Sequence, residues 1–257
     1  MHHDRGFRSG AMPLHQRRLQ SHHWVLTAQR TIYRALMGFG VALLVATGPW
    51  AALTFDVLRN TAMVQHGEAT LKVIDQWIAL IKKIEPLSDQ EKLQYTNNFF
   101  NSAVSWITDQ DNWQQEDYWA TPLETLARRK GDCEDFSISK YITLVLSGMP
   151  EEKLRITYVK ARITENGVAR NQAHMVLAYY PKPMSEPLIL DNIARDIVRG
   201  SLRRDLTPVF GFNTGVITVG HGTKPSNEKP TNRLSRWGDA LAKMKQEGIC
   251  LPGEACS

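Results

Sequence analysis

A lone cysteine stands among three acidic residues in the stretch Arg128-Arg129-Lys130-Gly131-Asp132-Cys133-Glu134-Asp135-Phe136. The following run, to Leu146, repeats apolar residues at three- and four-residue spacing, which predicts a buried helix with Cys133 on its first turn. There, free backbone N–H groups and the positive end of the helix dipole favour a thiolate. An isolated cysteine is more often a small buried apolar residue. The three acids argue against that interpretation, because carboxylates are not buried without partners.

The composition is that of a globular protein with a basic leader. The chain has 257 residues, enough for one ample domain or two small ones, with 42% hydrophobic and 22% charged residues. The segment up to Arg34 is rich in arginine and has a single acid, Asp4, so that the remaining chain is close to neutral. We therefore do not take the basic pI as a sign of nucleic-acid binding, and we predict no nucleic-acid partner.

Residues 1–53 have the features of an export signal. An arginine-containing region precedes an uncharged apolar stretch from Ala35 to Ala46, and a segment of small residues with Pro49 follows. We predict a signal peptide cleaved near Ala51 or Ala52. The alternative is a retained anchor, because the uncharged stretch to Leu53 is long enough to span a bilayer. Both interpretations place the following domain outside the cytoplasm.

Cysteine usage agrees with an oxidising compartment. Besides Cys133 the chain has only Cys250 and Cys256, with five residues between them near its end. These two could form a local disulfide and leave Cys133 unpaired. An unpaired thiol in an exported protein requires a reason, and catalysis is one.

The order of the predicted elements indicates an α+β fold. Helices are expected first, over 56–66, 69–84, from a capping box at Ser88–Glu91, from a second capping box at Thr121–Glu124, and after Cys133. A polar, aromatic loop over 109–119 precedes the cysteine and could line its cleft. Strands are then expected over 156–163, 173–180, 187–190, 209–213 and 216–219. Short connections imply antiparallel neighbours.

We predict three parts of the chain. Residues 1–53 are the signal peptide or membrane anchor, residues 54–220 the globular domain, and residues 221–257 a polar linker with a C-terminal helix. Within the domain, helices come before an antiparallel sheet, as in α+β folds.

Three residues come in an order that suits a cysteine protease. Such an enzyme requires a thiolate, an imidazole that pairs with it, and a group that orients the imidazole. Cys133 begins a helix, His174 lies near the start of a strand, and Asp191 ends the next strand. Taken alone, His174 could be an ordinary histidine on a sheet, and Asp191 a residue of the turn after a strand.

Several strings of the sequence resemble the bacterial transglutaminase-like cysteine proteinases of the LapG type. The matching strings are Trp119-Ala-Thr-Pro-Leu-Glu-Thr-Leu126, Gly131-Asp-Cys-Glu-Asp-Phe136 with Lys140-Tyr141, Tyr158-Val-Lys-Ala161, Ala173-His-Met-Val-Leu-Ala-Tyr-Tyr180 and Leu188-Ile-Leu-Asp-Asn192. The resemblance extends from about Trp106 to Phe212. It implies a papain-like, transglutaminase-like fold, in which the helix of the nucleophile packs on an antiparallel sheet, and a Cys133–His174–Asp191 triad.

The resemblance also implies a biological role. Proteases of this type are periplasmic, depend on calcium, and cut the N-terminal region of a large surface adhesin, which releases cells from a biofilm. An inner-membrane cyclic-di-GMP receptor of the LapD type inhibits them. The residues that best match calcium ligands are Asp132 and Glu134, with Asp135 as a further candidate.

Calcium also has a physical rationale. Carboxylates around a thiol raise its pKa, and a hard cation bound by these acids would cancel that effect. The loop Asp109–Asp117 could supply further oxygen ligands. Alternatively, the acids cap the helix and face water, or pair with Arg128, Arg129 and Lys130.

Two other functions are compatible with the same residues. A transglutaminase would use the triad for acyl transfer to an amine instead of to water. A calcium-dependent binding module would leave Cys133 without a chemical role.

Overall fold

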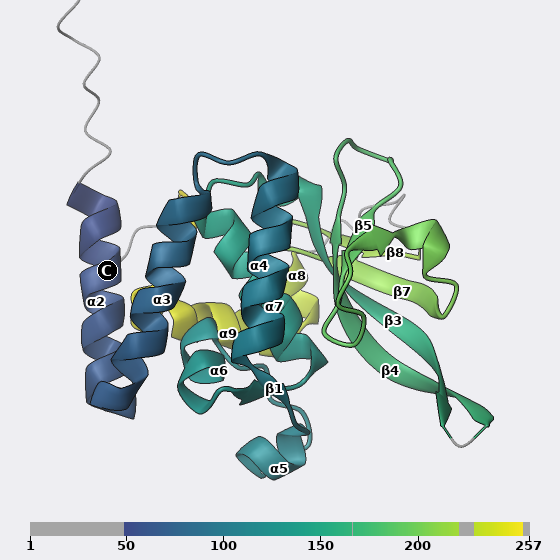
Figure 1. Cartoon of the computed structure of the whole chain (residues 1–257), viewed down its shortest axis with the longest axis horizontal. Helices are drawn as coiled ribbons and strands as arrows, with labels where there is room; N and C mark the ends of the chain where they lie inside the picture. Colours follow the sequence, from purple (N-terminus) through teal and green to yellow (C-terminus); the bar gives the residue numbers. More distant parts are fainter. Residues whose placement is uncertain (1–48, 166, 221–228, 254–257) are drawn as a thin grey trace, which may run out of the picture. The chain divides into compact units, whose positions relative to one another are not determined.

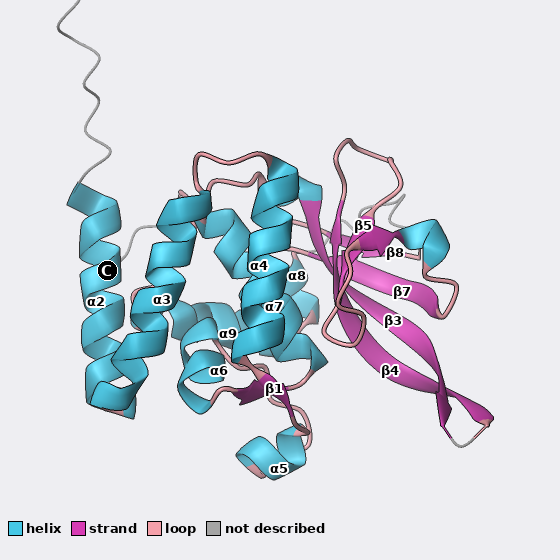
Figure 2. Cartoon of the chain, in the orientation of Figure 1, coloured by secondary structure: helices cyan, strands magenta, loops and turns pink. Residues whose placement is uncertain are grey.

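The computed structural model describes residues 49–165, 167–220 and 229–253, and residues from Trp50 onward form one compact unit. Figure 1 shows helices on one side of this unit and a sheet on the other, and Figure 2 marks the same division by secondary structure. No helix among the described residues is long and apolar enough to cross a membrane. Most of the predicted leader lies outside the described residues, and the predicted domain boundaries stay predictions.

The described helices include all the predicted ones, some of them with different bounds. They are α2 (Pro49–His66), α3 (Glu68–Ile84), α4 (Asp89–Ala103), α5 (Asp109–Trp113), α6 (Pro122–Arg128), α7 (Cys133–Leu146), α8 (Pro230–Arg233) and α9 (Ser235–Gln246). Both predicted capping boxes are confirmed, at Ser88 before α4 and at Thr121 before α6. Residues 109–119, predicted as a loop, contain the short α5, whose first turn is capped by the Thr108 side chain.

The sheet has six antiparallel strands in the order β6-β5-β4-β3-β7-β8. They are β3 (Leu154–Glu165), β4 (Val168–Tyr179), β5 (Leu188–Leu190), β6 (Val198–Arg199), β7 (Leu206–Phe212) and β8 (Ile217–Val219). A separate parallel pair joins β1 (Ser105–Trp106) to β2 (Lys130–Gly131). Strand β4 begins five residues before the predicted start. The prediction missed these residues because they are exposed and lack the apolar pattern of a buried strand.

Helix α7 is the centre of the core. It contacts α3, α4 and α6 as well as β3 and β4. Its residues from Asp135 to Val145 are buried, and the Trp77 indole of α3 donates to Thr143 Oγ1 at 2.7 Å. Trp237 of α9 is fully buried against Tyr141, with the ring centroids 5.9 Å apart. The C-terminal helix, which we predicted as part of a tail, therefore contributes to the same core as α7.

We expect the contact between α2 and the turn after α9 to contribute measurably to stability. Gly148 and Gly248 both follow a helix with positive φ, 82° and 80°. A Cβ on Gly148 would meet nothing within 4 Å, whereas one on Gly248 would lie 2.7 Å from Val57 Cγ1. Gly148→Ala should lower the free energy of unfolding by about 1 kcal/mol through backbone strain. Gly248→Ala should lower the free energy of unfolding by roughly 1–3 kcal/mol more than Gly148→Ala does, because α2 must shift.

Urea unfolding of both variants measures this difference. Equal losses in the two variants would mean that α2 does not pack against this turn as described.

Candidate active site

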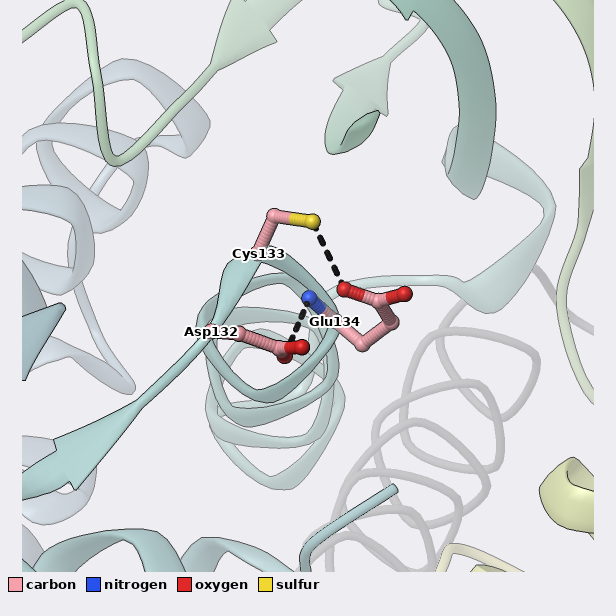
Figure 3. A group of neighbouring side chains, drawn as sticks. All are labelled: Asp132, Cys133 and Glu134. Atoms are coloured by element: carbon pink, nitrogen blue, oxygen red, sulfur yellow. Dashed lines mark hydrogen bonds between the residues drawn. The ribbon is translucent and has the colours of Figure 1, made fainter. Parts of the chain in front are cut away.

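Cys133 is held at the first turn of α7 by its two neighbours in sequence. The Asp132 side chain is the N-cap, and it accepts the backbone N–H groups of Glu134 and Asp135 at 3.1 and 3.4 Å. The Asp135 carboxylate accepts the Asp132 N–H at 3.3 Å, which completes a capping box. The Cys133 thiol donates to Glu134 Oε2 at 2.6 Å (Figure 3).

Gly131 makes this arrangement possible. A Cβ at this position would lie 2.7 Å from Asp135 Oδ2 and 2.8 Å from Asp135 Cβ. Asp135 is fully buried, and its other carboxylate oxygen accepts the Ala120 N–H at 2.8 Å. Only glycine at 131 lets the buried carboxylate lie against the chain and cap the helix that carries Cys133.

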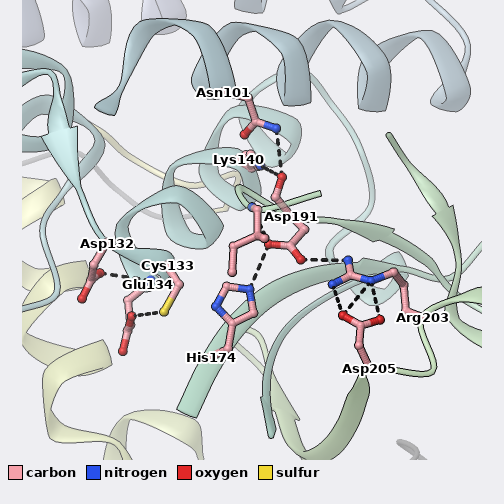
Figure 4. A network of polar contacts seen from close by, with 10 residues as sticks. Asn101, Asp132, Cys133, Glu134, Lys140, His174, Asp191, Arg203 and Asp205 are labelled. Carbon is pink, nitrogen blue, oxygen red and sulfur yellow. Dashed lines mark hydrogen bonds and ion pairs between the residues drawn. The ribbon is translucent and has the colours of Figure 1, made fainter. Parts of the chain in front are cut away.

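The structure brings the three predicted catalytic residues to one place. His174 lies on β4, and its Nε2 is 2.9 Å from Oδ1 of Asp191, the residue after β5. In Figure 4 the other ring nitrogen, Nδ1, faces Cys133. Cys133 and His174 line the same cavity, of about 580 Å³. A thiol and an imidazole thus line one cavity, and a carboxylate orients the imidazole; the catalytic role of the three stays a prediction.

Asp191 is fixed by contacts to its backbone as well as to its side chain. Its carbonyl oxygen accepts Lys140 Nζ at 3.1 Å and Asn101 Nδ2 at 2.9 Å, and its Oδ1 accepts the Ile193 N–H at 3.0 Å. Burial opposes the charge of Asp191, yet the hydrogen bond and charge of His174 and the Ile193 N–H lower its pKa to about 2. Burial also lowers the pKa of Lys140 to about 7, against the attraction of Asp191.

Four carboxylates gather beside the thiol. Among the described residues, donor atoms of Asp132, Cys133 and Glu134 lie within 4.8 Å of one another, and so do those of Asp109, Asp132 and Asp135. Asp109 begins α5; its Oδ2 accepts the Tyr118 N–H at 2.5 Å, while its buried Oδ1 has no hydrogen-bond partner in the structure. A buried oxygen without a partner, in an all-oxygen carboxylate cluster, fits a hard cation such as Ca²⁺.

Asp109 itself was not among the predicted metal ligands, although the loop Asp109–Asp117 was considered as a further source of oxygen ligands. The polar loop that contains it was expected to line the cleft, but its spacing in sequence gives no sign that it meets Asp132. The predicted residues Asp132, Glu134 and Asp135 all belong to the two groups of candidate ligands.

The pKa values show the electrostatic cost of this cluster. Burial, and then the charges of Glu134, Asp135 and Asp109, raise the pKa of Asp132 to about 10. Burial also raises the pKa of Asp109 to about 6, although the Tyr118 N–H opposes it. The pKa of the Cys133 thiol is raised by burial and by the charges of Glu134 and Asp132. Without a cation, the cluster therefore opposes the thiolate that the helix start favours.

Two tryptophans near the site have different surroundings. Trp119, at the end of the loop that could line the cleft, stacks on Phe212 with the ring centroids 5.6 Å apart and packs against the core. Trp106 of β1, which is 57% exposed, lines the cavity instead, together with Gln172 and Ile193.

Comparisons with known proteins show which family and which solved structures this chain is similar to. A family model described as bacterial transglutaminase-like cysteine proteinase matches residues 78–201. The calcium-bound structure of Legionella pneumophila LapG is 36% identical, with 74% of this chain and 98% of that chain covered and a TM-score of 0.63. The EGTA-treated structure of the same protein is 34% identical, with 74% and 97% covered and a TM-score of 0.64. No curated protein matches the chain.

We expect the metal-free protein to lose stability as the pH rises. Asp109 and Asp132 have pKa values of about 6 and 10 in the fold, against an ordinary value of 3.8. Between 3.8 and these values the folded state binds more protons than the unfolded chain, so the free energy of unfolding falls with rising pH. Thermal melting in a chelator across this window measures the fall, and added calcium should remove most of it.

Asp132→Asn is the matched variant, because asparagine caps helices as well as aspartate but carries no charge. Its melting temperature should vary less with pH. A wild-type melting temperature that rises with pH across this window in chelator would contradict the prediction.

Proposed function

The chain belongs to the bacterial transglutaminase-like cysteine proteinase family, and we propose that it is a calcium-dependent cysteine endopeptidase acting in the periplasm. Its substrate on this proposal is the N-terminal region of a large repeat adhesin, so that the enzyme controls the attachment and release of biofilm cells. The observation that carries the proposal is the His174–Asp191 hydrogen bond on the cavity that Cys133 lines.

In the proposed reaction, the three residues form a thioester with the substrate and then hydrolyse it. His174 takes the proton of the Cys133 thiol, and the thiolate attacks the scissile carbonyl carbon. The Cys133 backbone N–H, at the start of α7, stabilises the oxyanion. His174 then gives its proton to the leaving amine, and water hydrolyses the thioester to release the new carboxylate. Asp191 keeps the imidazole oriented through both steps.

The shape of the sheet supports an extended polypeptide as the substrate. β5 pairs with β4 only from Leu177 to Tyr179. Among the described residues, the edge of β4 beside the cavity, from Val168 to Val176, therefore has no strand partner on that side. Ala173 and Gln172 on this edge line the cavity. A free strand edge beside a nucleophile suits a substrate that binds by main-chain hydrogen bonds.

Calcium would be held by the carboxylates of Asp109, Asp132, Glu134 and Asp135. It would supply positive charge that balances the cluster, so that the Cys133 thiol ionises more readily. The comparison structures of LapG include a calcium-bound and an EGTA-treated form.

The partner and the location are proposed from the family resemblance. On this proposal the leader exports the chain to the periplasm, free or anchored at the inner membrane. There, an inner-membrane cyclic-di-GMP receptor of the LapD type binds and inhibits it.

We expect Cys133→Ala to lower the cleavage rate of an adhesin N-terminal fragment by a factor of about a thousand or more. Gel electrophoresis measures the rate, and mass spectrometry identifies the products. Two fragments that sum to the substrate plus one water indicate hydrolysis, whereas a crosslinked or aminated product would indicate a transglutaminase. An alanine variant that cleaves as fast as the wild type would exclude Cys133 as the nucleophile, as in a binding module.

We also expect EGTA to abolish cleavage and excess calcium to restore it. Asp109→Asn should weaken the calcium dependence of activity by at least about tenfold, because it removes one anionic ligand. Asp111→Asn is the matched control, since Asp111 lies on the same helix α5 but is exposed and outside both candidate ligand groups. Equal calcium dependence in the two variants would remove Asp109 from the site.

A further inference from the structure

We propose that Arg203 is a positioning residue for the candidate triad, because it fixes the Asp191 carboxylate in the orientation that holds His174 toward Cys133. This inference rests on the proposed catalytic function of these three residues. Arg203 lies just after the short 3₁₀ turn Gly200–Leu202, far from Cys133 in the sequence.

The two oxygens of the Asp191 carboxylate have different partners. The side chain is fully buried; Oδ1 accepts from His174 Nε2 and from the Ile193 N–H. Oδ2 forms an ion pair with Arg203 Nη1 at 2.8 Å, and in the described part of the chain it has no hydrogen-bond partner, so this ion pair is its polar contact. Removing the guanidinium would leave a buried anionic oxygen without a partner, so the carboxylate would turn toward another donor.

The guanidinium of Arg203 is itself held from its other side. Its Nε is 3.0 Å from Asp205 Oδ1, and its Nη2 is 2.8 Å from Asp205 Oδ2 (Figure 4). The planar fork thus uses one edge for Asp205 and leaves Nη1 for Asp191. The Arg203 side chain is only 10% exposed, so these charge-assisted contacts are largely shielded from water.

The freedom that remains to Asp191 is the rotation of its carboxylate. Lys140 and Asn101 hold its backbone carbonyl, and Ile193 follows it in a tight turn. Arg203 restricts the last torsion, about Cβ–Cγ, and thereby keeps Oδ1 on His174. The charged and titratable groups around the carboxylate are His174 on β4, Lys140 on α7, Arg203 itself and Asp205 beyond it.

Arg203 also lines a second cavity. This cavity, of about 510 Å³, lies on the sheet face that carries the buried side chains of Val159, Val176 and Ile189. A small cation in solution can therefore reach the position of the guanidinium if the side chain is shortened. This makes chemical rescue a practical test.

The test measures how fast iodoacetamide alkylates Cys133 in calcium-containing buffer, with mass spectrometry locating the adduct. The assay needs no substrate. His174→Ala gives the rate without the imidazole. We expect Arg203→Ala to react about tenfold more slowly than the wild type, and guanidinium at millimolar concentration to restore much of the rate. Arg203→Lys should restore part of it, and Asp205→Asn should cause a smaller fall.

Arg204→Ala is the matched control, because Arg204 is exposed and in no ion pair within the described residues; its rate should equal that of the wild type. A wild type no faster than His174→Ala would overturn the proposed function and this inference together. A fast wild type with an equally fast Arg203→Ala would overturn only the positioning role. A slow Arg203→Ala whose alkylation rate guanidinium does not restore would also overturn the positioning role. If Arg203→Ala does not fold, Asp205→Asn decides, and an unchanged rate in that variant overturns the role.

Discussion

The capping box between Asp132 and Asp135 is the interaction on which the site depends. It ends β2, begins α7 and places Cys133 on the first turn, all through side chains that reach backbone N–H groups. It requires glycine at 131, because Asp135 occupies the space of a Cβ there. The same contacts that position the thiol therefore also bring buried carboxylates next to it.

This arrangement sets two electrostatic effects against each other. The helix start favours a thiolate, whereas burial, Glu134 and Asp132 raise the pKa of the thiol. These contacts alone therefore oppose ionisation of the Cys133 thiol. A cation among the carboxylates would offset the negative charges that raise this pKa, so on the proposed function calcium acts as a condition for activity.

Both layers of the fold, helices and sheet, hold His174 and Asp191 in the site. The sheet supplies His174 and Asp191, while Lys140 of α7 and Asn101 of α4 hold the Asp191 carbonyl. Because Lys140 and Cys133 lie on the same helix, one rigid element positions the thiol and also the strand end that orients the imidazole. Arg203, which lines the cavity on the sheet face of Val159, Val176 and Ile189, pairs with the Asp191 carboxylate.

The local sequence determined the caps at Ser88 and Thr121, the helix after Cys133 and the alternating strands around His174, because each depends on neighbouring residues or on a short period. The order Cys133, His174, Asp191 and the family resemblance identified the candidate site. Only the tertiary structure decided that Asp109 meets Asp132, that Arg203 faces Asp191 and that Trp106, not Trp119, lines the cavity. These contacts join residues on separate elements, and no spacing along the chain encodes how helix and sheet are packed.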